Sequence, residues 1–138
     1  AGVDQSNVQG KAALLLPVDP DRSARLLMES IRKKAGKEIA VVITDTFGRP
    51  FREGQTNVAI GIAGIHPIKS YVGSQDMYGR TLKVSEIAIA DELAAAAELV
   101  MGKSEGVPVA IVRGYKFEKA AKSSAKSLQR SRRRDLFR

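Results

Sequence analysis

Cysteine and tryptophan are absent from this chain of 138 residues, and aromatic residues make up only 5% of it. The absence of cysteine excludes disulfide bonds, thiolate metal sites and a cysteine nucleophile. The single histidine, His66, excludes a histidine-rich metal cluster, and we expect its side chain to pack or to hydrogen-bond locally. Because aromatic residues are so few, the core must be built from isoleucine, valine, leucine and alanine.

Long apolar runs are also lacking, so no segment is long enough to cross a bilayer as a helix. No signal peptide is visible at the N-terminus. Hydrophobic residues make up 43% of the chain and charged residues 28%, as in a globular domain with one core. We therefore expect a cytoplasmic protein without membrane association.

The first residues, Ala-Gly-Val-Asp, include no initiator methionine. Chain ends usually fray, so a ligand-binding Asp4 would be poorly placed at a true terminus. We expect a preceding segment, either on this polypeptide or on another one.

Positive charge is concentrated near the C-terminus. The chain carries a net charge of +8, but nine basic and two acidic residues give the segment 116–138 a balance of +7. We predict a core over residues 1–115 and a basic, helical tail over residues 116–138. A nucleic-acid-binding module that acts through this tail is an alternative function, although the tail lacks the interleaved aromatic residues that stack on bases.

Alternating helical and strand-like patterns predict an α+β domain with mixed layers, in which helices pack on a sheet. The clearest helix follows Asp19, a good N-cap before Pro20, and ends at Gly36. We expect a buried strand at 12–16, further strands at 38–44, 57–63, 65–72 and 107–112, and helices at 20–35, at 84–101 and from about 116 onward.

Three polar loops adjoin these elements, an arrangement typical of sites held by a rigid scaffold. They contain Asp4 with Asn7, Asp45 with Thr46, and the glycine-flanked segment 102–106. Asp45 and Thr46 place two hard oxygens at the end of an apolar strand, and Mg²⁺ or Mn²⁺ prefers such ligands. The alternative is that Asp45 only caps the following turn.

The other two loops also have two interpretations each. Asp4 lies in Asp-Gln-Ser-Asn, which is ordinary turn composition. The segment 102–106 could expose amides to a phosphate, but it is not a Walker A loop and could be only a helix stop.

Two further groups of charged residues are candidates for anion binding. Arg49 and Arg52 flank Pro50 and could bind phosphate or carboxylate, or could simply be solvated. Asp76 and Arg80 could form nothing more than a turn. The residues alone therefore indicate a domain with an oxygen-ligated metal and anion site, but they indicate no reaction.

Seven stretches of the chain resemble, in the same order, the coenzyme F420-0:L-glutamate ligases, also called F420 gamma-glutamyl ligases. The combination of Ile-Thr-Asp-Thr-x-Gly-Arg with Pro-x-Asp-Pro-Asp is highly specific. Family members are longer, so the resemblance implies that their N-terminal half, which supplies part of the GTP site, is absent here. The stretches are AGVDQSNV at 1–8, LLLPVDPDRSA at 14–24, VVITDTFGRPFREG at 41–54, AIGIAGIHPI at 59–68, DMYGRTL at 76–82, ADELAAAAELVMGK at 90–103 and GVPVAIVRG at 106–114.

The resemblance implies the fold of the F420 gamma-glutamyl ligases and a GTP-dependent ligase reaction. GTP phosphorylates the terminal carboxylate of F420-0, and the amine of L-glutamate then displaces phosphate from the acyl phosphate. A second glutamate can be joined through the gamma-carboxyl. The resemblance also implies two divalent ions, Mg²⁺ or Mn²⁺, together with K⁺, and a homodimer. A different metal–nucleotide enzyme, or a relative or fragment without ligase activity, is the alternative.

The resemblance also implies roles for individual residues. Asp4 and Asp45 match ligands of one metal ion, Thr46 contributes to a second ion, and Asn7 matches a GTP contact. The nucleotide loop corresponds to Gly102, Lys103, Ser104, Glu105 and Gly106.

This chain departs from the family's pattern at one position of that loop. Many members have an acidic residue directly after Met-Gly, where this chain has Lys103. Either Glu105 replaces that metal ligand or the ligand is lost. We add Asp45 and Arg49 as catalytic residues, and expect Arg49, Arg52 and Asp76 to bind phosphate or the carboxylate of glutamate.

Overall fold

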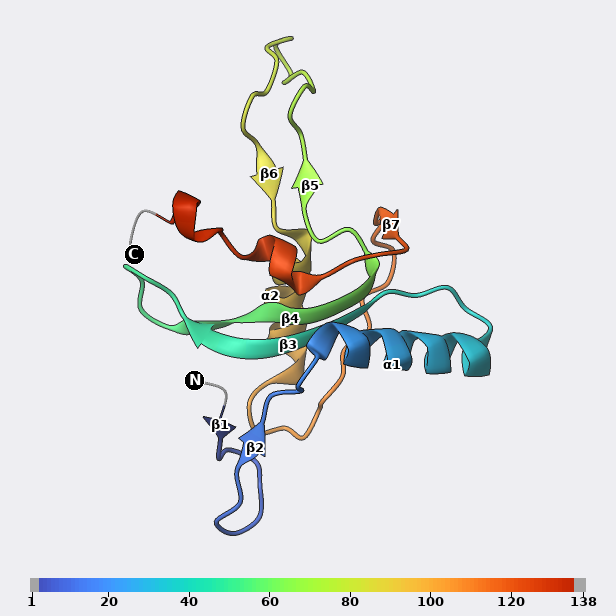
Figure 1. Ribbon diagram of the computed structural model, residues 1–138, viewed down its shortest axis with the longest axis vertical. Coiled ribbons are helices and arrows are strands. Elements are labelled where there is room, and N and C mark those ends of the chain that lie inside the picture. Colours follow the sequence, from blue (N-terminus) through green and yellow to red (C-terminus); the bar gives the residue numbers. More distant parts are fainter. Residues whose placement is uncertain (1–2, 136–138) are drawn as a thin grey trace.

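Two long antiparallel strands form the centre of the molecule. β3 (Val41–Gly48) pairs with β4 (Gln55–Ile65), and the register shifts after Ile43, so that Ile60 bulges out of β4. The computed structural model describes residues 3–135 and shows this curved hairpin packed with helices (Figure 1). The predicted α+β architecture is therefore confirmed.

α1 (Pro20–Ala35) has the ends that the sequence predicts. The Asp19 carboxylate accepts a hydrogen bond of 2.9 Å from the N–H of Arg22, and Gly36 ends the helix in the left-handed conformation. A Cβ at Gly61 of β4 would collide with the first residue of the helix. Glycine at this position therefore allows α1 to begin in direct contact with the strand.

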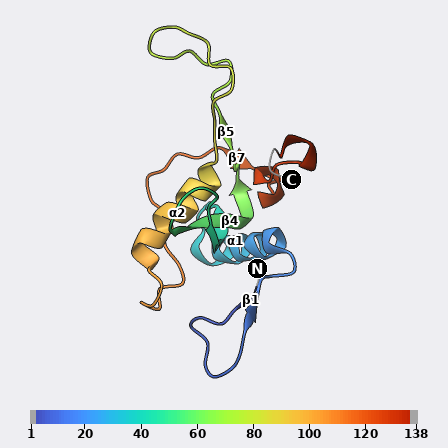
Figure 2. The ribbon, with the colours of Figure 1, turned by 90° about the vertical axis from the view of Figure 1, so that its left-hand side faces the viewer.

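α2 (Ile89–Met101) lies on the opposite side of β4 from α1 (Figure 2). Ala90 and Ala94 are buried, and such small side chains allow the helix to approach the sheet closely. The Asp91 carboxylate accepts a hydrogen bond of 2.9 Å from the N–H of Ala59. This bond satisfies a backbone group of β4 next to its bulge and fixes the position of α2.

A hairpin arm projects away from the two helices (Figure 1). β5 (Lys69–Ser70) and β6 (Glu86–Ile87) pair at its base. The strand predicted for 65–72 is therefore much shorter, and the helix predicted for 84–101 begins only at Ile89. Glu86 and Ile87 pair with β5, although the sequence pattern predicts them as part of the helix.

The basic tail folds back onto the core. β7 (Lys119–Ala120) pairs with the end of β4, and two 3-10 helices follow at Ala125–Leu128 and Arg132–Arg134. The prediction of a long helix is therefore wrong for the described part of the tail, and residues 136–138 lie outside the described residues. Hydrogen bonds to the core, together with those of the two short 3-10 helices, hold this segment.

Asp21 of α1 attaches the tail to β4. Its Oδ1 accepts hydrogen bonds from the N–H groups of Ile62 (2.9 Å) and Ala125 (3.0 Å), and its Oδ2 accepts one from the Ser124 hydroxyl (2.6 Å). Partial burial raises the pKa of Asp21, but these hydrogen bonds outweigh it and hold the pKa below its ordinary value. Ala125 consequently joins the buried core cluster with Ile62 and Ile65.

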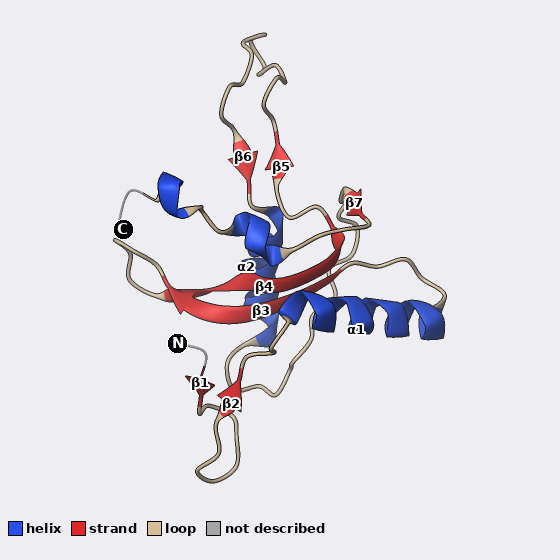
Figure 3. Cartoon of the chain, in the orientation of Figure 1, coloured by secondary structure: helices blue, strands red, loops and turns tan. Residues whose placement is uncertain are grey.

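Two predicted strands differ from those in the structure. At 12–16 only β2 (Leu14–Leu15) pairs, with β1 (Val3–Asp4), and both leucines are exposed rather than buried. The residues 107–112 form no strand, and Figure 3 draws the whole segment between α2 and β7 as loop. Both segments have strand-like composition, but a strand needs a hydrogen-bonded neighbour, and residues 3–135 supply none for 107–112.

Candidate functional site

The first and third predicted loops meet at the C-terminal end of α2. The side chain of Asn7 donates a hydrogen bond of 2.9 Å from Nδ2 to the carbonyl of Lys103. Asn7 has a positive φ of 54°, which asparagine tolerates better than most residues. The ammonium of Lys103 also lies 3.8 Å from an oxygen of Asp4. Two segments that are distant in sequence therefore form one polar surface.

Asp4 is exposed and adopts the turn geometry that its surroundings allow. Its two oxygens accept hydrogen bonds of 2.7 Å from the N–H and from the hydroxyl of Ser6. The backbone hydrogen bond from Ser6 is the main cause that lowers the pKa of Asp4, and the Lys103 ammonium lowers it further. Asp4 is thus a charged carboxylate at neutral pH, with lone pairs still open to solvent.

The segment 102–106 closes on itself in this structure. An oxygen of Glu105 accepts a hydrogen bond of 2.8 Å from the N–H of Ser104. A Cβ at Gly102, whose φ is 62°, would collide with the Glu105 carboxylate. The Glu105 carboxylate therefore lies against Gly102 and occupies the amide of Ser104.

Asp45 and Thr46 lie within β3, not in the loop that the sequence predicts after residue 44. β3 continues to Gly48 because its partner β4 begins early, at Gln55. Asp45 is half-buried, and one of its oxygens accepts a hydrogen bond of 2.8 Å from the N–H of Thr46. The second oxygen forms no hydrogen bond with another residue in the range 3–135 and is available to a ligand.

A partly buried network extends from Thr46 to α2. The Thr46 hydroxyl donates to the side-chain oxygen of Asn57 (2.7 Å), and Asn57 donates from Nδ2 to the Glu98 carboxylate (2.7 Å). Asn57 is only 5% exposed, so these partners fix its orientation. The carbonyl of Glu98 accepts the N–H of Gly102, and the network thus ends one helical turn before the 102–106 loop.

Sequence reasoning missed both Asn57 and Glu98. The available signal was a polar Asn at the start of an apolar strand, and a Glu one turn before the glycine that ends an alanine-rich helix. Each is ordinary by itself, and only the pairing of β3 with β4 and the packing of α2 bring them together.

No group of three or more His, Asp or Glu side chains in the range 3–135 is arranged to hold a metal ion. Asp4, Asp45 and Glu105 therefore form no three-carboxylate cluster among these residues. The ligand roles of Asp4, Asp45, Thr46 and Glu105 stay predictions.

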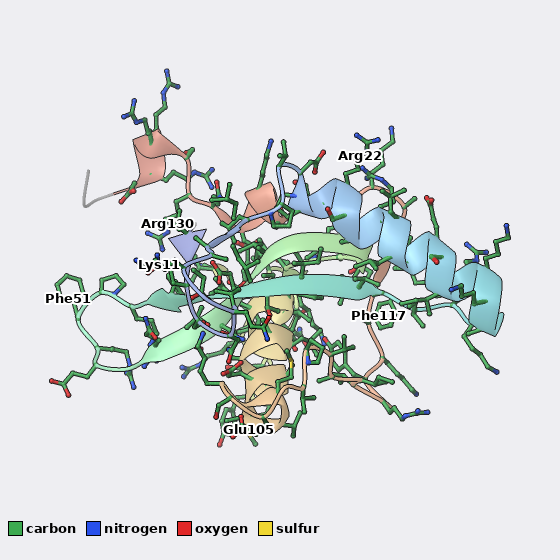
Figure 4. The ribbon with its side chains drawn as sticks, turned by 90° about the horizontal axis from the view of Figure 1, so that it is seen from below. Lys11, Arg22, Phe51, Glu105, Phe117 and Arg130 are labelled. Carbon is green, nitrogen blue, oxygen red and sulfur yellow. The ribbon has the colours of Figure 1, made fainter. Side chains whose placement is uncertain are left out.

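The arginines of the β3–β4 turn lie away from the 102–106 loop. Arg49 donates from Nη2 to the carbonyl of Glu53 (2.9 Å), and its buried Nε has no hydrogen-bond partner among the described residues. Phe51 at the tip of this turn and Glu105 beyond α2 lie well apart in Figure 4. The structure therefore does not bring Arg49 and Arg52 to the loop at 102–106.

Asp76 has local partners, whereas the backbone of His66 pairs with a residue distant in the sequence. An oxygen of Asp76 accepts hydrogen bonds from the N–H groups of Tyr78 (2.8 Å) and Arg80 (2.9 Å), which is the turn geometry given as the alternative interpretation. The backbone N–H of His66 donates to the carbonyl of Glu118.

Within residues 3–135, no helix is both long and apolar enough to span a membrane.

Comparison with known sequences gives a consistent family match. The family described as F420-0:Gamma-glutamyl ligase matches residues 1–114. The chain is 49% identical over 140 residues to a protein of Methanothermobacter thermautotrophicus, 49% over 144 residues to one of Methanopyrus kandleri, and 43% over 138 residues to one of Methanosarcina mazei. Each is named coenzyme F420:L-glutamate ligase.

These alignments cover this chain almost completely and the relatives only in part. They include 100%, 100% and 99% of the chain, but 56%, 56% and 54% of the three relatives. The chain therefore spans about half the length of the curated relatives that it matches.

Proposed function

This chain belongs to the F420-0:gamma-glutamyl ligase family, and we propose that it forms part of an enzyme that joins L-glutamate to coenzyme F420-0. The observation that supports this most directly is the hydrogen bond from Asn7 to Lys103. It joins two of the family-matching stretches, residues 1–8 and 90–103, at one end of α2. The proposed nucleotide contacts of both stretches therefore lie on one surface.

The reaction that we propose consumes GTP. The terminal carboxylate of F420-0 attacks the γ-phosphorus of GTP, the bond between that phosphorus and the β–γ bridging oxygen breaks, and GDP leaves. The amine of L-glutamate then attacks the acyl carbon, the carbon–oxygen bond to phosphate breaks, and the amine loses a proton. A carboxylate alone is a poor electrophile, so phosphorylation supplies the leaving group that amide formation requires.

The donor chemistry of the chain fits Mg²⁺ or Mn²⁺ bound together with a nucleotide. Magnesium is usually held by one or two carboxylates, with water and substrate phosphates completing its coordination. Asp45 offers one oxygen that forms no hydrogen bond with a described residue, and Thr46 offers a hydroxyl beside it. A bound divalent ion neutralises the charge of the phosphates. We propose Asp4 and Asp45 as protein ligands of one ion, and Thr46 with Glu105 as ligands of a second.

The remaining residues of the site orient these groups. Asn57 accepts the Thr46 hydrogen and so directs a lone pair of that hydroxyl away from the network. Glu98 in turn holds the amide of Asn57. Lys103 adds positive charge beside Asp4, where a phosphate would gain a counter-charge. The loop amides become accessible to a phosphate when the Glu105 carboxylate leaves Ser104.

The decisive experiment uses the complete enzyme, with this chain and the sequence that the relatives carry in addition. It is incubated with F420-0, L-glutamate, GTP and Mn²⁺, and products are identified by mass. We expect F420-0 to gain one or two glutamyl units and GTP to become GDP and phosphate. Replacement of GTP by ATP tests nucleotide choice. Absence of any glutamylated product from the folded, complete enzyme would exclude the ligase function.

Potassium, dimerisation and location complete the proposal. We propose that K⁺ stimulates the reaction, that the complete enzyme is a homodimer and that it acts in the cytoplasm. A titration of K⁺ against Na⁺ at constant ionic strength tests the first point, and sedimentation of the complete enzyme tests the second.

A further inference from the structure

A cavity of about 300 Å³ lies at the end of α2 that is away from the 102–106 loop. Three segments form its walls: the turn between β4 and β5, the first residue of α2, and the residues before β7. The lining combines apolar, aromatic and basic side chains and includes His66, Lys69, Ile89, Tyr115, Lys116 and Phe117. Cavities of this size with such a mixed lining are typical sites for small molecules.

Backbone hydrogen bonds hold the three walls together. The N–H of His66 donates to the carbonyl of Glu118 over 2.9 Å, and the N–H of Ala90 donates to the carbonyl of Pro67 over 3.2 Å. Phe117 is partly buried and packs against the core cluster. The fold itself therefore shapes the cavity before any ligand binds.

The lining carries more positive than negative charge. It includes the ammonium groups of Lys69 and Lys116 and one carboxylate, that of Glu118. The ammonium of Lys69 lies 4.8 Å from the centre of the Tyr71 ring. Tyr71 is the main cause that raises the pKa of Lys69, and Tyr115 raises it further, so this ammonium stays charged at neutral pH. Aromatic walls with an excess of positive charge suit a flat aromatic ligand that carries negative charge.

α2 separates this cavity from the 102–106 loop. The helix has 13 residues, so at about 1.5 Å per residue its ends lie roughly 20 Å apart. Figure 2 shows it running from the base of the β5–β6 arm to the loop that follows it. F420-0 has a similar length, because about ten single bonds join its flat deazaflavin ring to the carboxylate that accepts glutamate, and the ring with the extended chain spans on the order of 15–20 Å.

We propose that this cavity binds the deazaflavin ring of F420-0, while the carboxylate at the other end of that molecule extends toward the 102–106 loop. The inference rests on the proposed ligase function and adds to it the place where the acceptor substrate is recognised. Tyr115 and Phe117 contact the ring. Lys69 and Lys116 supply positive charge for the ring oxygens and for the phosphodiester of the chain. The ring thus selects the substrate without taking part in the chemical step.

The test uses the complete enzyme and two ligands, F420-0 and its deazaflavin–ribityl fragment, which lacks the phosphodiester and the carboxylate. Titration calorimetry with GDP and Mn²⁺ present measures both affinities, and we expect both ligands to bind. Tyr115→Leu should weaken both by about fivefold, because it removes an aromatic contact with the ring. Lys69→Gln should weaken F420-0 by a similar factor, because it removes a positive charge. In both variants the KM for F420-0 should rise by the same factor, with kcat and the affinity for GTP unchanged.

Tyr78→Leu and Lys83→Gln are the matched controls, because they make the same changes on the exposed β5–β6 arm. Thermal unfolding checks the fold of each variant, and Lys69 is exposed, so Lys69→Gln keeps the test valid even where Tyr115→Leu lowers stability. An unmodified enzyme that glutamylates F420-0 but does not bind the fragment, or whose cavity variants match their controls, would overturn the ring site alone. An unmodified enzyme that neither binds nor glutamylates F420-0 would refute the proposed function together with it.

Discussion

At the scale of single residues, Asp45 combines a fixed side chain with a free oxygen. The N–H of Thr46 holds one carboxylate oxygen, and the other forms no hydrogen bond with a described residue. Asp45→Asn keeps the size and the acceptor but removes the negative charge. We expect metal-dependent turnover of the complete enzyme to fall by about 100-fold, because a ligand for Mg²⁺ or Mn²⁺ is lost.

The measurement is the steady-state rate at several Mn²⁺ concentrations, together with thermal unfolding. Unfolding should change little, since the hydrogen bond to Thr46 persists. Glu29→Gln, on the exposed face of α1, removes the same charge far from the site and should leave the rate unchanged. A full rate for Asp45→Asn would refute the ligand role.

Asn57 is the residue whose loss should affect stability most directly within the site. Asn57→Ala removes the acceptor of Thr46 and the donor to Glu98, and it leaves two polar groups short of a partner. We expect the free energy of unfolding to fall by about 1–3 kcal/mol. Urea denaturation measures it, with the exposed neighbour Gln55→Ala as the control. Equal midpoints for the two variants would show that water replaces the network.

At the scale of elements, the contact between α1 and β4 depends on Gly61. A Cβ at this position meets the backbone of the residue at the start of α1, which cannot move without shifting the helix. Gly61→Ala should therefore reduce the free energy of unfolding by about 1–3 kcal/mol. Gly48→Ala, in the same hairpin, adds a Cβ to open space and should be tolerated. Thermal unfolding of both variants tests this, and equal melting temperatures would contradict it.

The elements that the sequence predicts well are those with local signals. α1 begins and ends where Asp19, Pro20 and Gly36 indicate, because capping involves only neighbouring residues. The segment 107–112 has equally strong strand composition and forms no strand, because strand formation depends on a partner that local sequence cannot specify. β3 extends through Asp45 for the converse reason, since β4 pairs with it there.

In the candidate site too, local sequence signals identify some residues, whereas others depend on how the elements pack. The sequence identifies Asn7 and the 102–106 loop as candidates, and the structure joins them through Lys103. The sequence does not reveal Asn57 and Glu98, because their roles arise only from the packing of α2 on β4. The placement of the other metal ligands stays a prediction from the resemblance.

At the scale of the whole molecule, Asp21 connects three parts of the chain. It belongs to α1, and it accepts hydrogen bonds from Ile62 in β4 and from Ser124 and Ala125 in the tail. Removal of its charge should therefore loosen the tail as well as the helix. Asp21→Asn is expected to lower the free energy of unfolding at pH 7 by about 1–3 kcal/mol, because hydrogen bonds to a charged acceptor are replaced by weaker ones.

The pH dependence of this effect follows from the lowered pKa of Asp21. Partial burial acts to raise that pKa, but the hydrogen bonds lower it below the value in the unfolded chain, so folding favours the ionised form. The stabilisation is complete above about pH 4, the ordinary range of aspartate, and is lost as the pH falls through the folded pKa. The difference in stability between the original chain and Asp21→Asn should therefore be constant from pH 7 to about pH 5 and shrink below pH 4. Urea denaturation over this range measures the difference, with Glu29→Gln as the control. A difference that persists at low pH would show that Asp21 acts through packing rather than through its charge.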